Sequence, residues 1–126
     1  MVSTDSTLEE ISVDRRGYLK LLRFGDYEAL VSFTVKGNSR SGYSFKIDRV
    51  YIVLSGSFEY SEKNLNDGKE TKKIIKTGDH FTVKPGNAHM FTALEESHMI
   101  EFTPGTKVKI GMIPYKPYRE ICEKDM

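Results

Sequence analysis

Apolar and polar residues alternate through much of this 126-residue chain. Between residues 27 and 36, every second residue from Ala29 to Val35 is apolar, which is the period of a β-strand with one buried face. This run stops at Gly37-Asn38, a pair of residues that favours a turn. The same arrangement, a short run closed by a turn signal, recurs along the chain.

Eight short strands are predicted in this way, and Asn66-Asp67-Gly68 adds a hairpin signal because these residue types tolerate positive φ. Many short strands at close spacing are typical of an all-β sandwich or closed barrel. Only Arg119–Lys124 has the character of a helix, of one or two turns. The predicted strands are Tyr18–Phe24, Tyr27–Lys36, Arg49–Leu54, Phe58–Tyr60, Thr71–Lys76, His80–Val83, His89–Leu94 and Ser97–Thr103.

The run Val50–Leu54 is apolar at every position, so both of its faces need cover from water. One face is expected to line the interior. The other needs a partner sheet, the N-terminal arm or a second subunit. We therefore expect a homodimer.

Charge and composition narrow the range of partners. The formal net charge is +1, which gives no electrostatic reason to expect binding to nucleic acid or to an anionic membrane. The first ten residues are polar and acidic, without the features of a signal peptide, and Cys122 is the only cysteine. A cytoplasmic protein without an intrachain disulfide is the expectation.

Two motifs stand in the middle of the chain. In the later one, Gly78 is followed after five residues by a turn element that contains Pro85-Gly86, and then after two residues by His89. The earlier frame begins at Gly37 and ends at Gly56 without a gap. These glycines and turns delimit short strands of a barrel.

Over residues 37–93 this pattern resembles the cupin superfamily. The resemblance implies an antiparallel double-stranded β-helix, or jelly-roll barrel. We divide the chain into an N-terminal arm or edge strand (1–14), a cupin barrel (15–115) and a C-terminal tail (116–126).

The resemblance also locates the family's metal ligands, and most of them are absent. The two histidine positions of the first motif hold Tyr43 and Phe45, the glutamate position holds Arg49, and only His89 remains. A fixed positive charge at the third position opposes a bound cation. We expect no metal at the family site and no cofactor. A relocated metal site from His89, His98 and Glu101, in a metal-dependent enzyme with displaced ligands, is a minor alternative.

A pocket without metal has different chemistry. Aromatic rings suit a sugar-like ligand, and Arg49 suits an anionic group. The leading hypothesis is therefore binding of a small organic ligand in an aromatic-lined pocket. If the cupin frame holds, the residues that converge there are Tyr43, Phe45, Arg49, Tyr51, Val53, His89 and Phe91.

An enzyme is the alternative. A metal-independent sugar isomerase or epimerase would use His89 with Tyr43 or Tyr51 as its proton-transfer pair, and Arg49 to stabilise an enolate. Phe45 and Phe91 would contact the ligand in either case. Structural roles are also open: His89 satisfied by a tyrosine, and Arg49 paired with Asp48, Glu59 or Glu101.

Overall fold

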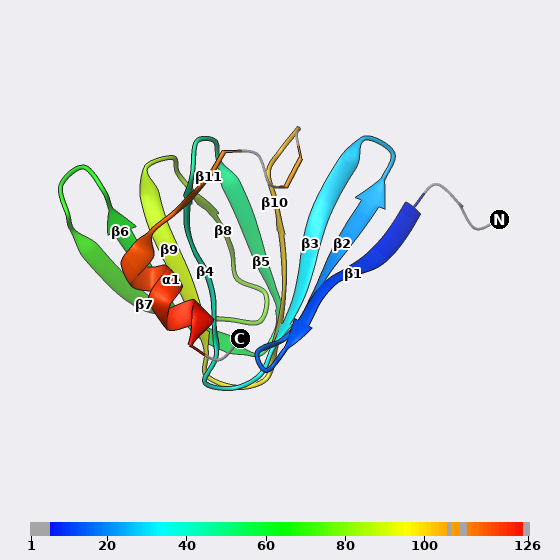
Figure 1. Cartoon of the computed structure of the whole chain (residues 1–126), viewed down its shortest axis with the longest axis horizontal. Coiled ribbons are helices and arrows are strands. Elements are labelled where there is room, and N and C mark those ends of the chain that lie inside the picture. Colours follow the sequence, from blue (N-terminus) through cyan, green and yellow to red (C-terminus); the bar gives the residue numbers. More distant parts are fainter. Residues whose placement is uncertain (1–5, 106, 109–110, 125–126) are drawn as a thin grey trace.

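Two antiparallel sheets face each other across a shared core in the computed structural model, which describes residues 6–105, 107–108 and 111–124 (Figure 1). The first sheet has six strands in the order β1-β2-β3-β10-β5-β8. Their bounds are β1 Ser6–Asp14, β2 Gly17–Phe24, β3 Tyr27–Thr34, β10 Ser97–Phe102, β5 Arg49–Ser55 and β8 His80–Val83.

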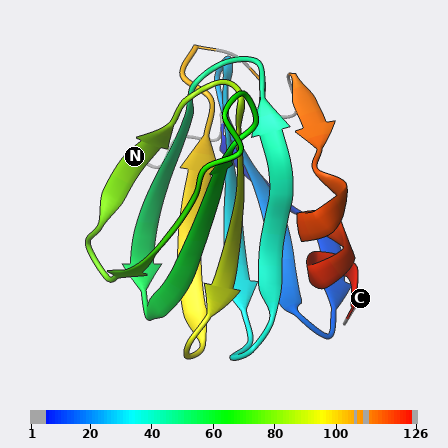
Figure 2. The same ribbon diagram turned by 90° about the vertical axis from the view of Figure 1, so that its left-hand side faces the viewer.

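The second sheet has five strands in the order β11-β4-β9-β6-β7, and a short helix, α1 (Lys116–Glu123), lies against it (Figure 2). Tyr118 and Cys122 of α1 pack on Ala88 and Met90, which point out of this sheet. The strands are β11 Met112–Pro114, β4 Ser39–Phe45, β9 Asn87–Ala93, β6 Ser57–Asn64 and β7 Glu70–Lys76.

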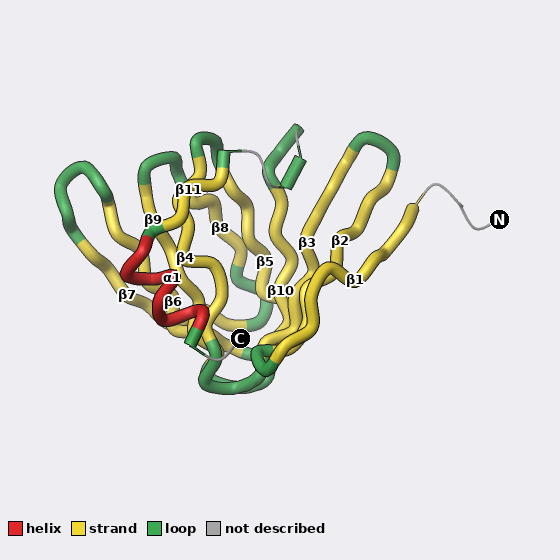
Figure 3. The backbone as a smooth tube through the Cα atoms, viewed as in Figure 1, coloured by secondary structure: helices red, strands yellow, loops and turns green. Residues whose placement is uncertain are grey.

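The all-β prediction is confirmed (Figure 3), and all eight predicted strands correspond to observed ones, with ends that differ by a few residues. Residues 6–14 form β1, which pairs with β2 at the sheet edge; residues 1–5 of the predicted arm lie outside the described residues. Strands β4 and β11 were not predicted. The helix begins three residues earlier than expected because Pro117, which suits the first turn of a helix, starts it.

Aromatic side chains fill the space between the sheets. Tyr51, Phe58 and Phe91 have no exposed surface, and Tyr60 is 3% exposed. The ring centroids of Tyr51 and Phe91 lie 4.6 Å apart. Burial of each such side chain contributes about 1.5–3 kcal/mol. The apolar run of β5 therefore located the core correctly. In β3 the predicted alternation has the opposite phase: Leu30, Ser32 and Thr34 are buried, whereas Val31 and Phe33 are only partly buried and point outward.

Candidate functional site

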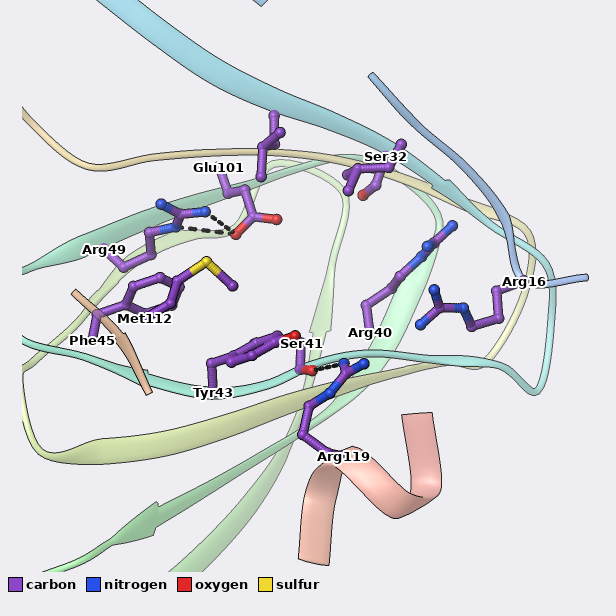
Figure 4. Close-up of a pocket in the computed structure, with 12 residues that line it drawn as sticks. Arg16, Ser32, Arg40, Ser41, Tyr43, Phe45, Arg49, Glu101, Met112 and Arg119 are labelled. Carbon is purple, nitrogen blue, oxygen red and sulfur yellow. Dashed lines mark hydrogen bonds and ion pairs between the residues drawn. The ribbon is translucent and has the colours of Figure 1, made fainter. Parts of the chain in front are cut away.

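A cavity of about 270 Å³ opens between the two sheets beside β4 (Figure 4). Four arginines and one carboxylate lie in its wall, so its charge is predominantly positive. The lining residues are Arg16, Leu19, Leu30, Ser32, Arg40, Ser41, Tyr43, Phe45, Arg49, Glu101, Met112 and Arg119.

A β-bulge in β4 brings Arg40 and Tyr43 to the same face. In the pairing of β4 with β9, Arg40 lies opposite Phe91 and Tyr43 lies opposite His89. The register shifts between Ser41 and Tyr43. In a regular strand, residues three apart point to opposite faces. Ser41 has φ of 77° and Gly42 has φ of 87°, so the extra residue is accommodated by left-handed backbone.

Arg40 is the most distinctive residue of the cavity. It is 7% exposed, and its hydrogen bonds go to neutral acceptors: Nε donates to Thr34 Oγ1 at 3.1 Å and Nη2 donates to the carbonyl of Phe33 at 2.9 Å. Within the described residues, no carboxylate lies within 4.0 Å of its guanidinium. Burial and the charge of Arg16 lower its pKa to about 10, so Arg40 still carries its charge at neutral pH.

The other arginines have acidic partners. Arg16 Nη2 donates to Asp14 Oδ2 at 2.9 Å. Arg119 Nη2 donates to Glu123 at 2.9 Å, while its Nη1 donates to the carbonyl of Ser41 at 2.6 Å. These pairings leave Arg40 without a carboxylate within 4.0 Å among the described residues, although the charges of Asp14 and Glu101 still favour its charged form.

Arg49 is held by Glu101 at the other end of the cavity from Arg40 (Figure 4). Its Nε and Nη2 donate to Glu101 Oε2 at 3.1 and 3.0 Å, and its Nη1 donates to Thr103 and to the carbonyl of Val108. The guanidinium also lies 4.4 Å above the Phe45 ring. Of the partners considered from the sequence, Glu101 is therefore the one observed, and it uses much of Arg49's hydrogen-bonding capacity.

The structure divides the residues predicted to form one site. Tyr43, Phe45 and Arg49 line the cavity, whereas His89 lies deeper, between Phe45 and the aromatic core. The other predicted site residues do not line the cavity, and each is no more than 1% exposed: Tyr51, Val53, His89 and Phe91.

His89 and Tyr51 form a buried hydrogen-bonded pair through His89 Nε2 and the Tyr51 hydroxyl. Burial, and then the charge of Arg49, lower the pKa of His89 to about 3, so its ring is neutral. Burial also raises the pKa of Tyr51 well above its usual value. His89 Nδ1 is buried without a hydrogen-bond partner in the described part of the chain.

The residues at the cupin metal positions do not fit a divalent cation. His89 Nε2 is bonded to Tyr51, and the guanidinium of Arg49 lies over Phe45. Elsewhere in the described ranges, three or more His, Cys, Asp or Glu side chains do not gather in a group that could hold a metal ion. The relocated site from His89, His98 and Glu101 is thus not formed; His98 bonds to Ser55 instead.

Sequence reasoning missed Arg16, Arg40 and Arg119 as cavity residues. Arg40 follows a turn and precedes Ser41-Gly42, a dipeptide that signals a turn or bulge; this signal was available but not used. Arg16 and Arg119 lie far away in sequence, in the β1–β2 turn and in α1. Their position depends on how the C-terminal segment packs, which no local pattern reveals.

Comparisons with known proteins identify the fold. Neither a protein-family model nor a curated protein matches the sequence. Solved structures do match. Oxalate decarboxylase of Bacillus subtilis has a TM-score of 0.71 and 16% identity, covering 90% of this chain and 33% of its own. The capsular polysaccharide assembling protein CapF of Staphylococcus aureus has a TM-score of 0.69 and 14% identity, covering 86% of this chain and 31% of its own.

A third similar structure is Drosophila melanogaster CENP-C, solved bound to CAL1, with a TM-score of 0.62 and 15% identity; 76% of this chain and 80% of that chain are covered. The present chain thus spans about a third of the length of the decarboxylase and of CapF. At these identities the likeness concerns the fold. Since the decarboxylase and the matching domain of CapF are cupins, the predicted cupin fold is confirmed.

Proposed function

We propose that this protein binds a small organic anion in the arginine-lined cavity, without a metal at the cupin ligand positions. The observation that carries the proposal is Arg40, a buried and charged guanidinium whose hydrogen bonds all go to neutral groups. A buried charge without a counter-ion costs free energy, and an anion in the cavity offsets that cost.

The distribution of charge favours an anionic ligand over a neutral sugar. Arg16 lies at the same end of the cavity as Arg40 (Figure 4), and its charge lowers the pKa of Arg40. A carboxylate or phosphate between them accepts charge-assisted hydrogen bonds from both. The Tyr43 ring is less accessible to a sugar because Arg119 already lies 4.7 Å from its centroid.

The cavity volume limits the size of the ligand. About 270 Å³ lies just below the range of roughly 300–1,000 Å³ that is typical of sites for drug-sized molecules. This supports a small carboxylate or sugar phosphate over a nucleotide-linked sugar.

Isomerisation receives less support from the geometry. His89 and Tyr51 form the hydrogen bond that proton transfer would need, but both are fully buried and neither lines the cavity. A general base must reach the proton that it removes. We therefore propose binding, with His89 and Tyr51 as a structural pair.

A thermal-denaturation series tests the proposal. Citrate, malate and glucose 6-phosphate are compared with glucose and with sodium chloride at matched ionic strength. We expect at least one of the organic anions to raise Tm, because a ligand that binds only the folded state stabilises it, and we expect glucose to leave Tm unchanged. If none of the anions raises Tm beyond sodium chloride, or if glucose raises it as much, the proposal is wrong.

A further inference from the structure

The outward face of the six-stranded sheet is apolar across its central strands. In the register of β2, β3, β10 and β5, one cross-strand row runs from Lys20 through Val31 and Ile100 to Ile52. These side chains point away from the core, since their neighbours Leu21, Leu30, Met99, Tyr51 and Val53 point into it. We call this surface the outer apolar face; its main residues are Phe24, Tyr27, Val31, Ile52, Ile100 and Phe102.

A groove of about 420 Å³ lies in the outer apolar face, between the end of the β2–β3 hairpin and β10. Phe24 and Tyr27 form one wall, stacked with centroids 5.6 Å apart. They are 45% and 60% exposed. Ile100 and Phe102 form the opposite wall. A contiguous apolar surface with a hollow and exposed aromatics is characteristic of a protein-binding face.

The outward face of the other sheet differs. Its strands β6 and β7 present Glu59, Lys63, Lys72 and Lys76, and α1 covers the apolar residues of β9 (Figure 1). The outward face of the five-stranded sheet is therefore charged or covered by α1, whereas the outward face of the six-stranded sheet is apolar. An apolar outward face is thus a feature of one sheet of this chain and not of both.

Described segments of this chain do not cover the outer apolar face. Strand β1 (residues 6–14) extends the sheet beyond β2, at the edge away from β5, and so does not lie over Ile52 or Ile100. Helix α1 packs on the five-stranded sheet. The partner sheet and the described part of the N-terminal arm (residues 6–14) therefore do not cover Val50–Leu54, and a second subunit is the cover that we consider next.

We propose that two copies of this chain associate through the outer apolar face, related by a two-fold axis. At about 3.3 Å per residue and about 4.8 Å between strands, the four strands of this face span roughly 460 Å². With the flanking strands β1 and β8 the sheet spans roughly 650 Å², which approaches the ~800 Å² per partner of a stable interface. The outward residues of β3 carry no charge, and Lys20 lies opposite Glu10 in β1. Packing the face on itself therefore brings few like charges together.

Sedimentation equilibrium of the full chain over a range of protein concentrations tests this association. The expected mass is that of two chains. Tyr27→Lys and Ile100→Lys place charges in the interface and are expected to give the mass of one chain. Ile74→Lys is the matched control, because Ile74 in β7 is 59% exposed, as Tyr27 is 60% exposed, but lies on the other sheet. The control is expected to remain a dimer.

Circular dichroism establishes that each variant is folded. If Ile100→Lys does not fold, Tyr27→Lys decides alone, since its side chain is largely exposed in the single chain. A wild-type mass of one chain at the highest concentration overturns the proposal and leaves the face to a different protein. Folded variants that stay dimeric overturn it as well, because two copies would then meet elsewhere.

Discussion

Individual side chains decide which chemistry this cupin-fold sandwich supports. At the positions where the resemblance places metal ligands, Tyr43, Phe45 and Arg49 make an aromatic and cationic wall, and His89 is enclosed behind it. The identity of each residue was available from the sequence. Their separation into a cavity and a closed core was not, because both groups share the inward face and period-2 alternation gives no depth along the barrel.

The buried His89 gives the stability of the protein a specific pH dependence. In the unfolded chain its pKa is near 6.5, and in the folded chain it is about 3. Between these values the unfolded state binds the proton and the folded state does not, so stability is present above pH 6.5 and is lost as the pH falls. We expect this histidine to lower the free energy of unfolding by up to about 1.4 kcal/mol per pH unit from pH 6.5 to 5.

Urea denaturation at several pH values within this window measures the effect. His89→Leu is expected to flatten the pH dependence, although it leaves the Tyr51 hydroxyl without its partner and lowers stability at pH 7. His98→Gln is the control, because His98 is only partly buried and bonds to Ser55. An unchanged slope in His89→Leu would show that His89 is not a neutral buried group.

Among the elements, β4 contributes most to the site and was the least visible in the sequence. Its bulge brings Arg40 to the cavity, but Ser39, Arg40, Ser41 and Gly42 have no apolar alternation, so the strand was not predicted. Strand β5 was predicted because its continuous apolar residues meet the core. Strand β3 was predicted because its apolar residues alternate, although Val31 and Phe33 of that alternation lie on the outward face. Strand β4 is polar in its first half and is ordered by pairing with β9 and by contact with α1. It therefore has no hydrophobic pattern from which a strand could be predicted.

Gly42 and Gly37 form a matched pair that tests this interpretation of the bulge. Both have φ of +87°, but a Cβ on Gly42 would lie 2.8 Å from Arg119 Cδ and 3.0 Å from its backbone nitrogen, whereas a Cβ on Gly37 meets nothing within 4 Å. Positive φ costs about 1–2 kcal/mol in either alanine variant. Gly42→Ala is expected to cost about 1–3 kcal/mol more, because α1 must shift.

Urea denaturation gives both costs, and limited trypsin digestion reports whether α1 stays in place. We expect faster cleavage at Arg119 in Gly42→Ala than in Gly37→Ala. Equal stability losses and equal cleavage rates would mean that Gly42 is needed only for its backbone conformation, and that α1 is not held against the bulge.

In the whole molecule, the cavity is built from segments that are distant in the chain: the β1–β2 turn supplies Arg16, β4 supplies Arg40, β10 supplies Glu101 and α1 supplies Arg119. The fold was therefore predictable from local patterns and two motifs, while the charge of the cavity was not.

Within the described residues no helix has the length and apolar character to span a membrane. We propose that Arg40 makes this cavity an anion site.

Isothermal titration calorimetry with citrate, and with glucose 6-phosphate in a parallel series, tests that claim most directly. Loss of a charge-assisted hydrogen bond costs about 1.5–3 kcal/mol, so Arg40→Gln is expected to weaken binding of the anion about 10- to 100-fold. Arg15→Gln removes the same charge from an exposed neighbour of Arg16 and is expected to leave the affinity within about twofold. Equal affinities of wild type and folded Arg40→Gln would contradict the account.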